Sequence, residues 1–172
     1  MALRALGLGD LLTVVPALKA LARAFPQHRR ILAAPQALRP LVELIRVDAE
    51  PAGLKAASDG GPSSAPAIHE LTHAPGLSPL SPETRGTALA VNLHGSGPES
   101  HRVLLASDPQ AMLAFRHADV PESAGGPPWP GAVHEVERWC RLLQESGIAV
   151  DPAALGLAPP AAEPRPGGAG PT

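Results

Sequence analysis

The stretch that decides the fold is RALGLGDLLTVVPALKAL, residues 4–21. An apolar opening over residues 1–6 runs into two glycines and an aspartate, Gly7, Gly9 and Asp10, and a helical pattern follows. Apolar residues recur at the spacing that lays one stripe along a helix, at positions 11, 15, 18, 22 and 25. This succession predicts a strand, a tight loop and a helix, which together open an α/β unit.

The two glycines and Asp10 mark the start of that helix as a candidate ligand site. Glycine lets the backbone adopt positive φ and lets a ligand come close to it. The free N–H groups and the positive dipole end of a helix start hold a carboxylate. From spacing alone, Asp10 is either an ordinary N-cap or a functional carboxylate.

Two phosphate-binding motifs do not fit this loop. A dinucleotide fingerprint needs a third glycine where Leu12 stands, and an acidic residue about 20 positions further on, where the chain has QHRR at 27–30. A Walker loop needs Gly-Lys-Ser or Gly-Lys-Thr, which the sequence does not contain. We therefore expect neither a dinucleotide cofactor nor a P-loop.

Composition bounds the class of protein. A chain of 172 residues with 44% hydrophobic content predicts one globular domain with a real core. A net charge of −2 gives no electrostatic argument for nucleic acid. The single cysteine, Cys140, excludes an internal disulfide and is expected to be a small buried hydrophobe in a reducing compartment. No apolar run reaches the ~18 residues of a transmembrane helix, and the start does not resemble a signal peptide, so we expect a cytoplasmic protein.

Periodicity and turn residues predict the remaining elements. We expect strands at 31–34, 89–93 and 112–115, a short one at 47–49, and helices at 35–46, 99–106 and from 133 to a cap at Gly147. Residues 51–86 and 120–130 are rich in Gly, Pro and Ser and are expected to be loops with little regular structure. We assign a domain to residues 1–157 and a disordered linker or tail to 158–172.

One segment of the first loop spells a zinc motif. His69, Glu70 and His73 form H-E-x-x-H, which on a helix would place two imidazoles and a general base on one face. Pro66 and Pro75 leave room for barely two helical turns, which favours a solvated loop. A zinc hydrolase stays open as an alternative.

A second informative stretch is ALAVNLHGSGPESHR, residues 88–102. Its apolar run predicts a buried parallel strand that delivers a polar loop to the carboxyl end of the sheet, where open α/β sheets bind ligands. We expect His94 and Ser96, with Gly95 and Gly97 in the turn, to contact a ligand or to satisfy nearby backbone. His101 and Arg102 are candidates for an anionic group such as phosphate.

The segments RALGLGDLLTVVPALKAL and NLHGSGPESHR resemble signatures of glycosyltransferase family 9, which includes the heptosyltransferases of lipopolysaccharide assembly. The resemblance implies a Rossmann-like parallel sheet with flanking helices that forms one half of a GT-B fold. It implies that Asp10 is the general base at the acceptor site, and that Gly7, Gly9 and the 94–102 loop face the acceptor. In that loop, His94 and Ser96 would bind sugar hydroxyls. No metal or resident cofactor is required.

The resemblance also implies the partners. The acceptor would be a glycan or a lipid-linked sugar, with transient membrane-surface contact left open, and a nucleotide-sugar would bind in a second domain. Because the chain stops where that donor domain would begin, we expect a truncated form, with inverting transfer of a heptose-like sugar as its function. The alternative is a catalytically inactive sugar-binding remnant.

Overall fold

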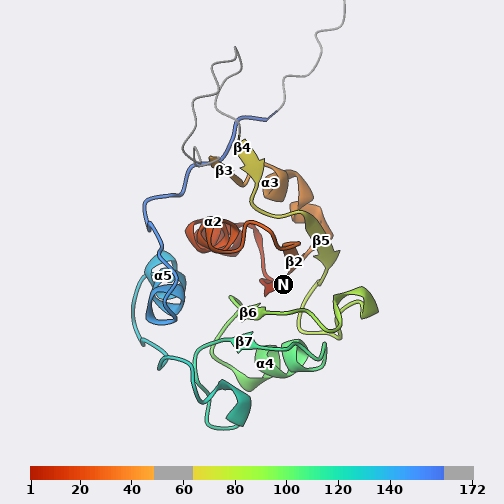
Figure 1. The fold of residues 1–172 in the computed structure, drawn as a ribbon, viewed down its shortest axis with the longest axis vertical. Helices are drawn as coiled ribbons and strands as arrows, with labels where there is room; N and C mark the ends of the chain where they lie inside the picture. The colour runs from red at the N-terminus through yellow and green to blue at the C-terminus, as the bar shows by residue number, and fades with distance from the viewer. Residues whose placement is uncertain (49–63, 161–172) are drawn as a thin grey trace, which may run out of the picture.

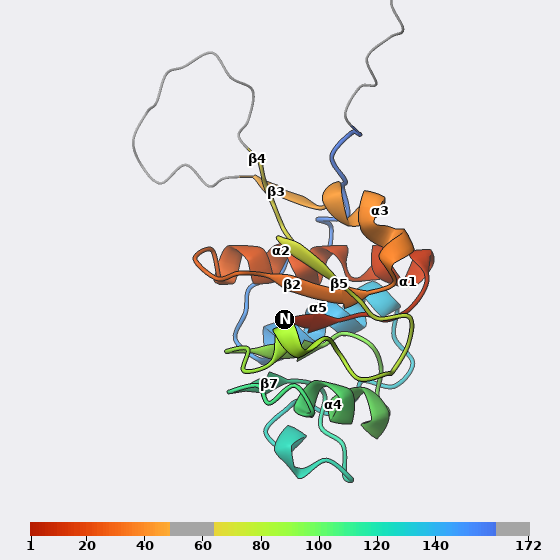
Figure 2. The same cartoon turned by 90° about the vertical axis from the view of Figure 1, so that its right-hand side faces the viewer.

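A computed structural model describes residues 1–48 and 64–160. Its centre is a parallel sheet in the order β5-β2-β1-β6-β7 (Figure 1). The strands are β1 (Ala2–Leu3), β2 (Ile31–Ala34), β5 (Glu70–His73), β6 (Ala90–Asn92) and β7 (Met112–Leu113). Helices flank this sheet, as Figure 2 also shows. The predicted α/β class with a Rossmann-like parallel sheet is confirmed.

The first predicted helix is two helices. α1 (Leu8–Thr13) ends at Val14, and α2 (Val15–Ala24) begins at once with Pro16 in its first turn. A proline there loses no helical hydrogen bond, because the first N–H groups of a helix have no partner within it. The amide of Leu18 then donates to the Val14 carbonyl at 2.9 Å. The chain therefore changes direction between α1 and α2 with little loss of hydrogen bonding.

A proline also restarts the second predicted helix. The chain forms a single 3₁₀ turn, η1 (Gln36–Leu38), and then α3 (Arg39–Glu43) with Pro40 in its first turn. The short strand that follows is β3 (Arg46–Asp48), which pairs with β4 (Ser64–Pro66) in a separate antiparallel ribbon. Ala49, the last residue of the predicted strand, lies outside the described residues.

The prediction of a loop over 51–86 is wrong within its described part, residues 64–86. Besides β4, this part contains the 3₁₀ helix η2 (Pro82–Thr84) and β5, which is an edge strand of the main sheet. β5 pairs with β2 from Glu70 to His73. Its sequence, ELTH, has neither an apolar run nor strict alternation, so its strand state comes from pairing with β2. Residues 51–63 lie outside the described residues.

The two faces of the sheet are covered differently. α2 and α5 (Glu135–Glu145) pack on one face with a large aliphatic cluster and Trp139. α4 (Pro98–Leu105) covers the other face through Leu104, together with the chain around Ala74 and Leu80. Cys140 is buried in α5, as predicted. No helix within the described residues is long and apolar enough to cross a membrane.

The end of α5 confirms the predicted glycine cap. Gly147 has φ +83 and its N–H donates to the Gln144 carbonyl at 3.0 Å. The N–H of Ile148 donates to the Leu143 carbonyl at 2.9 Å, which completes a Schellman motif. Beyond it, residues 158–160 have no helix or strand, and the Ala158 amide donates to the Leu44 carbonyl at 2.8 Å. The predicted tail otherwise falls on residues 161–172, outside the described part of the chain.

Candidate functional site

The strand order places the candidate site at a topological switch point. From β1 the chain builds outward to β2 and β5 on one side, and it later returns to build β6 and β7 on the other. In open α/β sheets a ligand crevice forms outside the carboxyl ends of the two strands where the order reverses. α1, with Asp10, follows β1, and His94 follows β6. Two of the predicted site residues therefore come together at this edge.

Asp10 lies inside the first turn of α1 and is not its N-cap. The helix begins at Leu8, its N-cap is Gly7, and no side chain caps it. The N-cap alternative for Asp10 is therefore wrong. The Asp10 side chain is 47% exposed and accepts a hydrogen bond at Oδ1 from Arg4 Nη2 at 3.3 Å. Within the described residues its Oδ2 has no hydrogen-bond partner, which leaves that oxygen open to a ligand.

Arg4 organises this edge, and sequence analysis missed it. The residue directly follows β1 and is 1% exposed, so its guanidinium lies under the loops and not in solvent. It donates from Nε to the Asp10 carbonyl at 3.0 Å, from Nη2 to Thr13 Oγ1 at 3.1 Å and from Nη1 to the Leu93 carbonyl at 2.7 Å. Burial lowers the Arg4 pKa to about 10, an effect that Asp10 opposes and Arg138 reinforces. The side chain is still a cation at neutral pH. An arginine at the end of an apolar strand was the only available signal.

A second layer lies behind Arg4, on α5. The Arg4 guanidinium lies 5.0 Å from the centre of the Trp139 ring, within cation–π range. Trp139 Nε1 donates to Glu135 Oε2 at 3.1 Å, and that same oxygen is 4.0 Å from Arg4 Nη2. Arg138 pairs with Glu135 and lies over the Trp129 ring at 4.5 Å. These contacts tie α5 to the loops after β1 and β6.

Arg138 is 8% exposed and does not lie on a solvated face of α5. The helix packs its first turn against the aromatic cluster of Phe115, Trp129 and Trp139, whose ring centres lie 5.1 to 6.2 Å apart. The Arg138 guanidinium lies over the Trp129 ring and pairs with Glu135. The α5 periodicity alone did not indicate this arrangement.

His94 lies half-buried at the mouth of the loop after β6. Its backbone N–H donates to Asn92 Oδ1 at 3.0 Å, which fixes the turn. Its ring Nδ1 is buried and has no hydrogen-bond partner in the described part of the chain. Burial first, and then the positive charge of Arg4, lower the pKa of His94, while Asp10 acts in the opposite direction. A neutral imidazole beside a carboxylate is suited to hydrogen bonding with sugar hydroxyls.

His101 does not lie where an anionic ligand could reach it. It is fully buried in α4, with Nε2 2.8 Å from the Phe115 carbonyl and Nδ1 2.9 Å from the Gly97 carbonyl. Asn92 Nδ2 donates to Ser100 Oγ at 2.9 Å in the same network. The expectation that His101 meets a phosphate is corrected: the residue holds the loop to α4 and β7. The sequence motif misled here because it does not show which helix face turns inward.

The other predicted residues of this loop are accessible. Ser96 and Arg102 are exposed, and Gly95 and Gly97 are half-buried. A Cβ added at Gly95 would meet nothing within 4 Å, so this turn has open space beside its backbone. These four residues remain candidates for ligand contact.

Gly7 and Gly9 are not needed for positive φ. Gly7 has φ −76, and the described glycines with positive φ are Gly86, Gly131 and Gly147. A Cβ at Gly9 would meet nothing within 4 Å, and one at Gly7 would meet only Asp10 Oδ2 at 3.8 Å. The conformational part of the glycine prediction is therefore wrong. What these glycines do provide is open space above Asp10.

The H-E-x-x-H segment lacks the helix that a zinc site of this type requires. Glu70 to His73 form β5, and His69 precedes it. His69 Nδ1 accepts the Arg30 amide at 3.1 Å, and His73 Nδ1 accepts the Gln36 amide at 3.2 Å. Glu70 pairs with Arg29. Each group of the motif thus has a structural contact with the neighbouring β2 region.

A scan of the chain against protein-family models, a search of curated proteins and a search of solved structures gave no match. The family resemblance of the sequence stays a prediction. The described structure itself is an α/β domain with a polar, partly open site at the carboxyl edge of its sheet.

Proposed function

We propose that this chain is the acceptor-binding half of an inverting glycosyltransferase of the family 9 type. The observation that carries the proposal is the carboxylate of Asp10, which is half-exposed at a switch point and held through one oxygen by a buried arginine. Glycans are neutral or anionic polyols. Such a site provides one carboxylate held in place as a base, nearby groups that can hydrogen-bond to hydroxyls, and glycine backbone that a ligand can approach closely.

The chemistry asked of Asp10 is general base catalysis. An acceptor hydroxyl would donate its proton to the Asp10 carboxylate as its oxygen attacks the anomeric carbon of the donor sugar. The nucleotide leaves from the opposite face, so configuration at that carbon inverts. In this scheme a second Rossmann-like domain, completing the GT-B arrangement, holds the nucleotide-sugar, and residues 1–157 supply the acceptor side.

Arg4 supports this role in two ways. Its contacts to the Asp10 carbonyl and carboxylate hold the base in one position, which limits the entropy lost when the acceptor binds. Because Arg4 binds Oδ1, the second carboxylate oxygen stays available for the acceptor hydroxyl. Arg4 is thus a positioning residue, and Asp10 is the catalytic residue.

The acceptor contacts would come from the loop after β6. We assign His94 and Ser96 to sugar hydroxyls, Gly7, Gly9, Gly95 and Gly97 to close backbone approach, and Arg102 to an anionic substituent. The reaction would run in the cytoplasm, at the membrane surface when the acceptor is lipid-linked. An inactive sugar-binding remnant would keep these contacts without transfer.

Acceptor binding can be tested on the chain as it is. Delipidated lipopolysaccharide core oligosaccharide would be titrated into ¹⁵N-labelled protein, with the backbone amides followed by NMR. We expect shifts at Gly7, Gly9 and residues 94–97, with Gly76 and Gly147 as internal controls away from the site. Shifts confined to other regions, or none, would contradict the proposal.

A further inference from the structure

A cavity of about 600 Å³ lies at the opposite edge of the sheet from Asp10. Its wall includes Met1 before β1, Arg30 and Ile31 at the start of β2, and Leu89 before β6. These are the amino ends of the parallel strands, whereas Asp10 and His94 follow the carboxyl ends. The volume falls within the roughly 300–1,000 Å³ of small-molecule pockets. The function proposed above makes no use of this cavity.

The interior of the cavity is apolar. Large apolar side chains contribute much of its wall, among them Leu18, Leu21, Phe25, Ile31, Ile68 and Leu89. They come from α2 and the residue that follows it, from β2 and from the segments before β5 and β6. A wall of this kind favours binding of an apolar ligand, because binding removes apolar surface from water.

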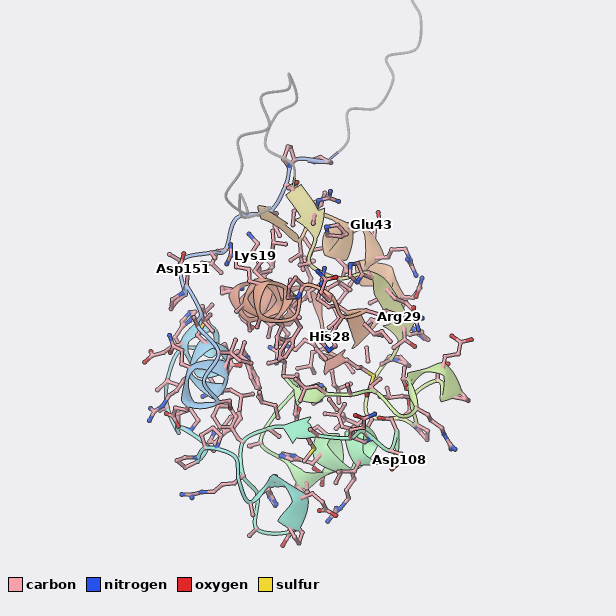
Figure 3. All side chains as sticks on the ribbon, in the orientation of Figure 1. Lys19, His28, Arg29, Glu43, Asp108 and Asp151 are labelled. Carbon is pink, nitrogen blue, oxygen red and sulfur yellow. The ribbon has the colours of Figure 1, made fainter. Side chains whose placement is uncertain are left out.

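Charged groups in the lining are mainly positive. Arg29, Arg30 and Arg85 line the cavity, with Glu83 as the one acidic residue of the lining. Arg29 pairs with Glu70, and the Arg30 guanidinium donates to backbone carbonyls that include Ala67 and Pro66. Arg85 is exposed and therefore accessible to an anion. Figure 3 labels His28 and Arg29, which lie on the segment that leads into β2.

A polar group of the lining is unsatisfied. Thr87 Oγ1 is buried and has no hydrogen-bond partner among the described residues. The oxygen is not accessible from the cavity in this rotamer, so a ligand carboxylate accepts its hydrogen bond only after the Thr87 side chain turns toward the cavity. Thr87 follows Arg85 by two positions, so this group and the exposed cation lie on the same short segment.

We propose that the cavity binds a free fatty acid, with its alkyl chain against Leu18, Leu21 and Ile68 and its carboxylate beside Arg85 and Thr87. The apolar wall accounts for the alkyl chain, and the exposed guanidinium of Arg85 accounts for the negative charge of the head group. This site is separate from the glycan site and does not depend on the function proposed for Asp10.

The isoleucines of the chain allow a direct test. Ile31 and Ile68 line the cavity, whereas Ile45 and Ile148 do not. Dodecanoate, kept below its micelle concentration, would be titrated into protein carrying labelled isoleucine methyl groups. We expect saturable shifts at Ile31 and Ile68 and none at Ile45 and Ile148. No saturable binding, or equal shifts at all four methyls, would overturn the proposal.

Two variants test the binding of the alkyl chain and of the carboxylate head group separately. Ala88 is exposed and lines the cavity, so Ala88→Trp should fill its mouth and abolish dodecanoate binding without disturbing the core. Arg85→Glu should weaken binding by about 3- to 10-fold, as reversal of one exposed charge allows. Arg116→Glu makes the same charge change at an exposed residue outside the lining and should leave binding unchanged. Equal losses in both arginine variants would contradict a defined head-group position.

Probe chemistry gives the last control. Dodecyltrimethylammonium has the same alkyl chain with a cationic head and should bind more weakly than dodecanoate, whereas inorganic phosphate, which lacks a chain, should not shift Ile31 or Ile68. Binding of the cation as tightly as the acid would overturn the assignment of the head group. If the protein associates with anionic lipid vesicles but does not bind monomeric dodecanoate, this face is a membrane-binding surface and the fatty-acid proposal is wrong.

Discussion

Arg4 Nη2 lies 3.3 Å from Asp10 Oδ1, and the same guanidinium donates to the Leu93 carbonyl at 2.7 Å. One buried side chain at the end of β1 therefore fixes the first turn of α1 and the loop after β6. It also lies over Trp139 of α5. The position of the candidate base thus depends on a residue that does not itself face the ligand.

Replacement of Arg4 should destabilise the fold. Arg4→Met keeps much of the aliphatic stem but leaves the buried Leu93 carbonyl without its donor, at a cost of about 1–3 kcal/mol. Urea unfolding followed by Trp fluorescence measures this free energy. Arg116→Met, at an exposed position, is the control and should change it by no more than about 0.5 kcal/mol. Equal stability of the two variants would mean that the Arg4 contacts contribute nothing.

Substitution of Gly9 should affect stability and ligand binding in opposite directions. A Cβ at Gly9 meets nothing within 4 Å and the residue lies in α1, so Gly9→Ala should keep or raise stability, by up to about 1 kcal/mol. If a ligand approaches the backbone here, the same methyl group should weaken binding of the core oligosaccharide. Thermal unfolding and NMR titration of one sample measure both effects. Unchanged oligosaccharide affinity would remove Gly9 from the binding site.

The sequence predicted the parts of this fold that have local signals. The apolar run around Val91 predicts a buried strand, and the apolar stripe of α2 predicts a helix. Gly147 predicts the C-terminal cap of α5. β5 has no such signal, because its strand state depends on pairing with β2, which only the folded chain provides. Asp10 and His94 could be found because each follows an element that periodicity predicts.

The other contacts of Arg4 could not be found in the same way. Arg4 and Glu135 are 131 positions apart in the sequence, 135 − 4, and meet only when α5 packs behind β1. His101 was misassigned for a related reason, since its burial depends on how α4 rotates against β6 and β7. Long-range packing decides which polar residues face a ligand. That packing cannot be predicted from local patterns in a single sequence.

Replacement of Gly126 by alanine should destabilise the fold, whereas the same replacement at Gly125 should not. A Cβ at Gly126 would overlap the backbone oxygen of Ala114, so Gly126→Ala forces the loop away from β7. We expect a loss of about 1–3 kcal/mol or more, as for overpacked sites. Gly125→Ala is the matched control, because a Cβ there meets nothing within 4 Å. Equal unfolding midpoints for the two variants would contradict this packing.

Protonation of His94 should weaken the fold. Burial and Arg4 lower its pKa in the folded protein, so the unfolded chain binds more protons below the ordinary value of 6.5. The free energy of unfolding should therefore fall as pH drops from about 7.5 to about 5.5, and His94→Gln should show a smaller fall. Urea unfolding at both pH values measures this. An NMR titration midpoint for His94 at or above 6.5 would contradict the assigned shift.

The most direct test of the central claim is glycosyl transfer by the native polypeptide, compared with transfer by the same polypeptide carrying the Asp10→Asn substitution. Labelled nucleotide-sugar and core oligosaccharide would be the substrates, and intact mass would record the full polypeptide. We predict transfer by the wild type, and a loss of about 10²- to 10⁴-fold in Asp10→Asn with an unchanged melting temperature. Wild-type turnover in Asp10→Asn, or no transfer by the native polypeptide, would contradict the role assigned to Asp10.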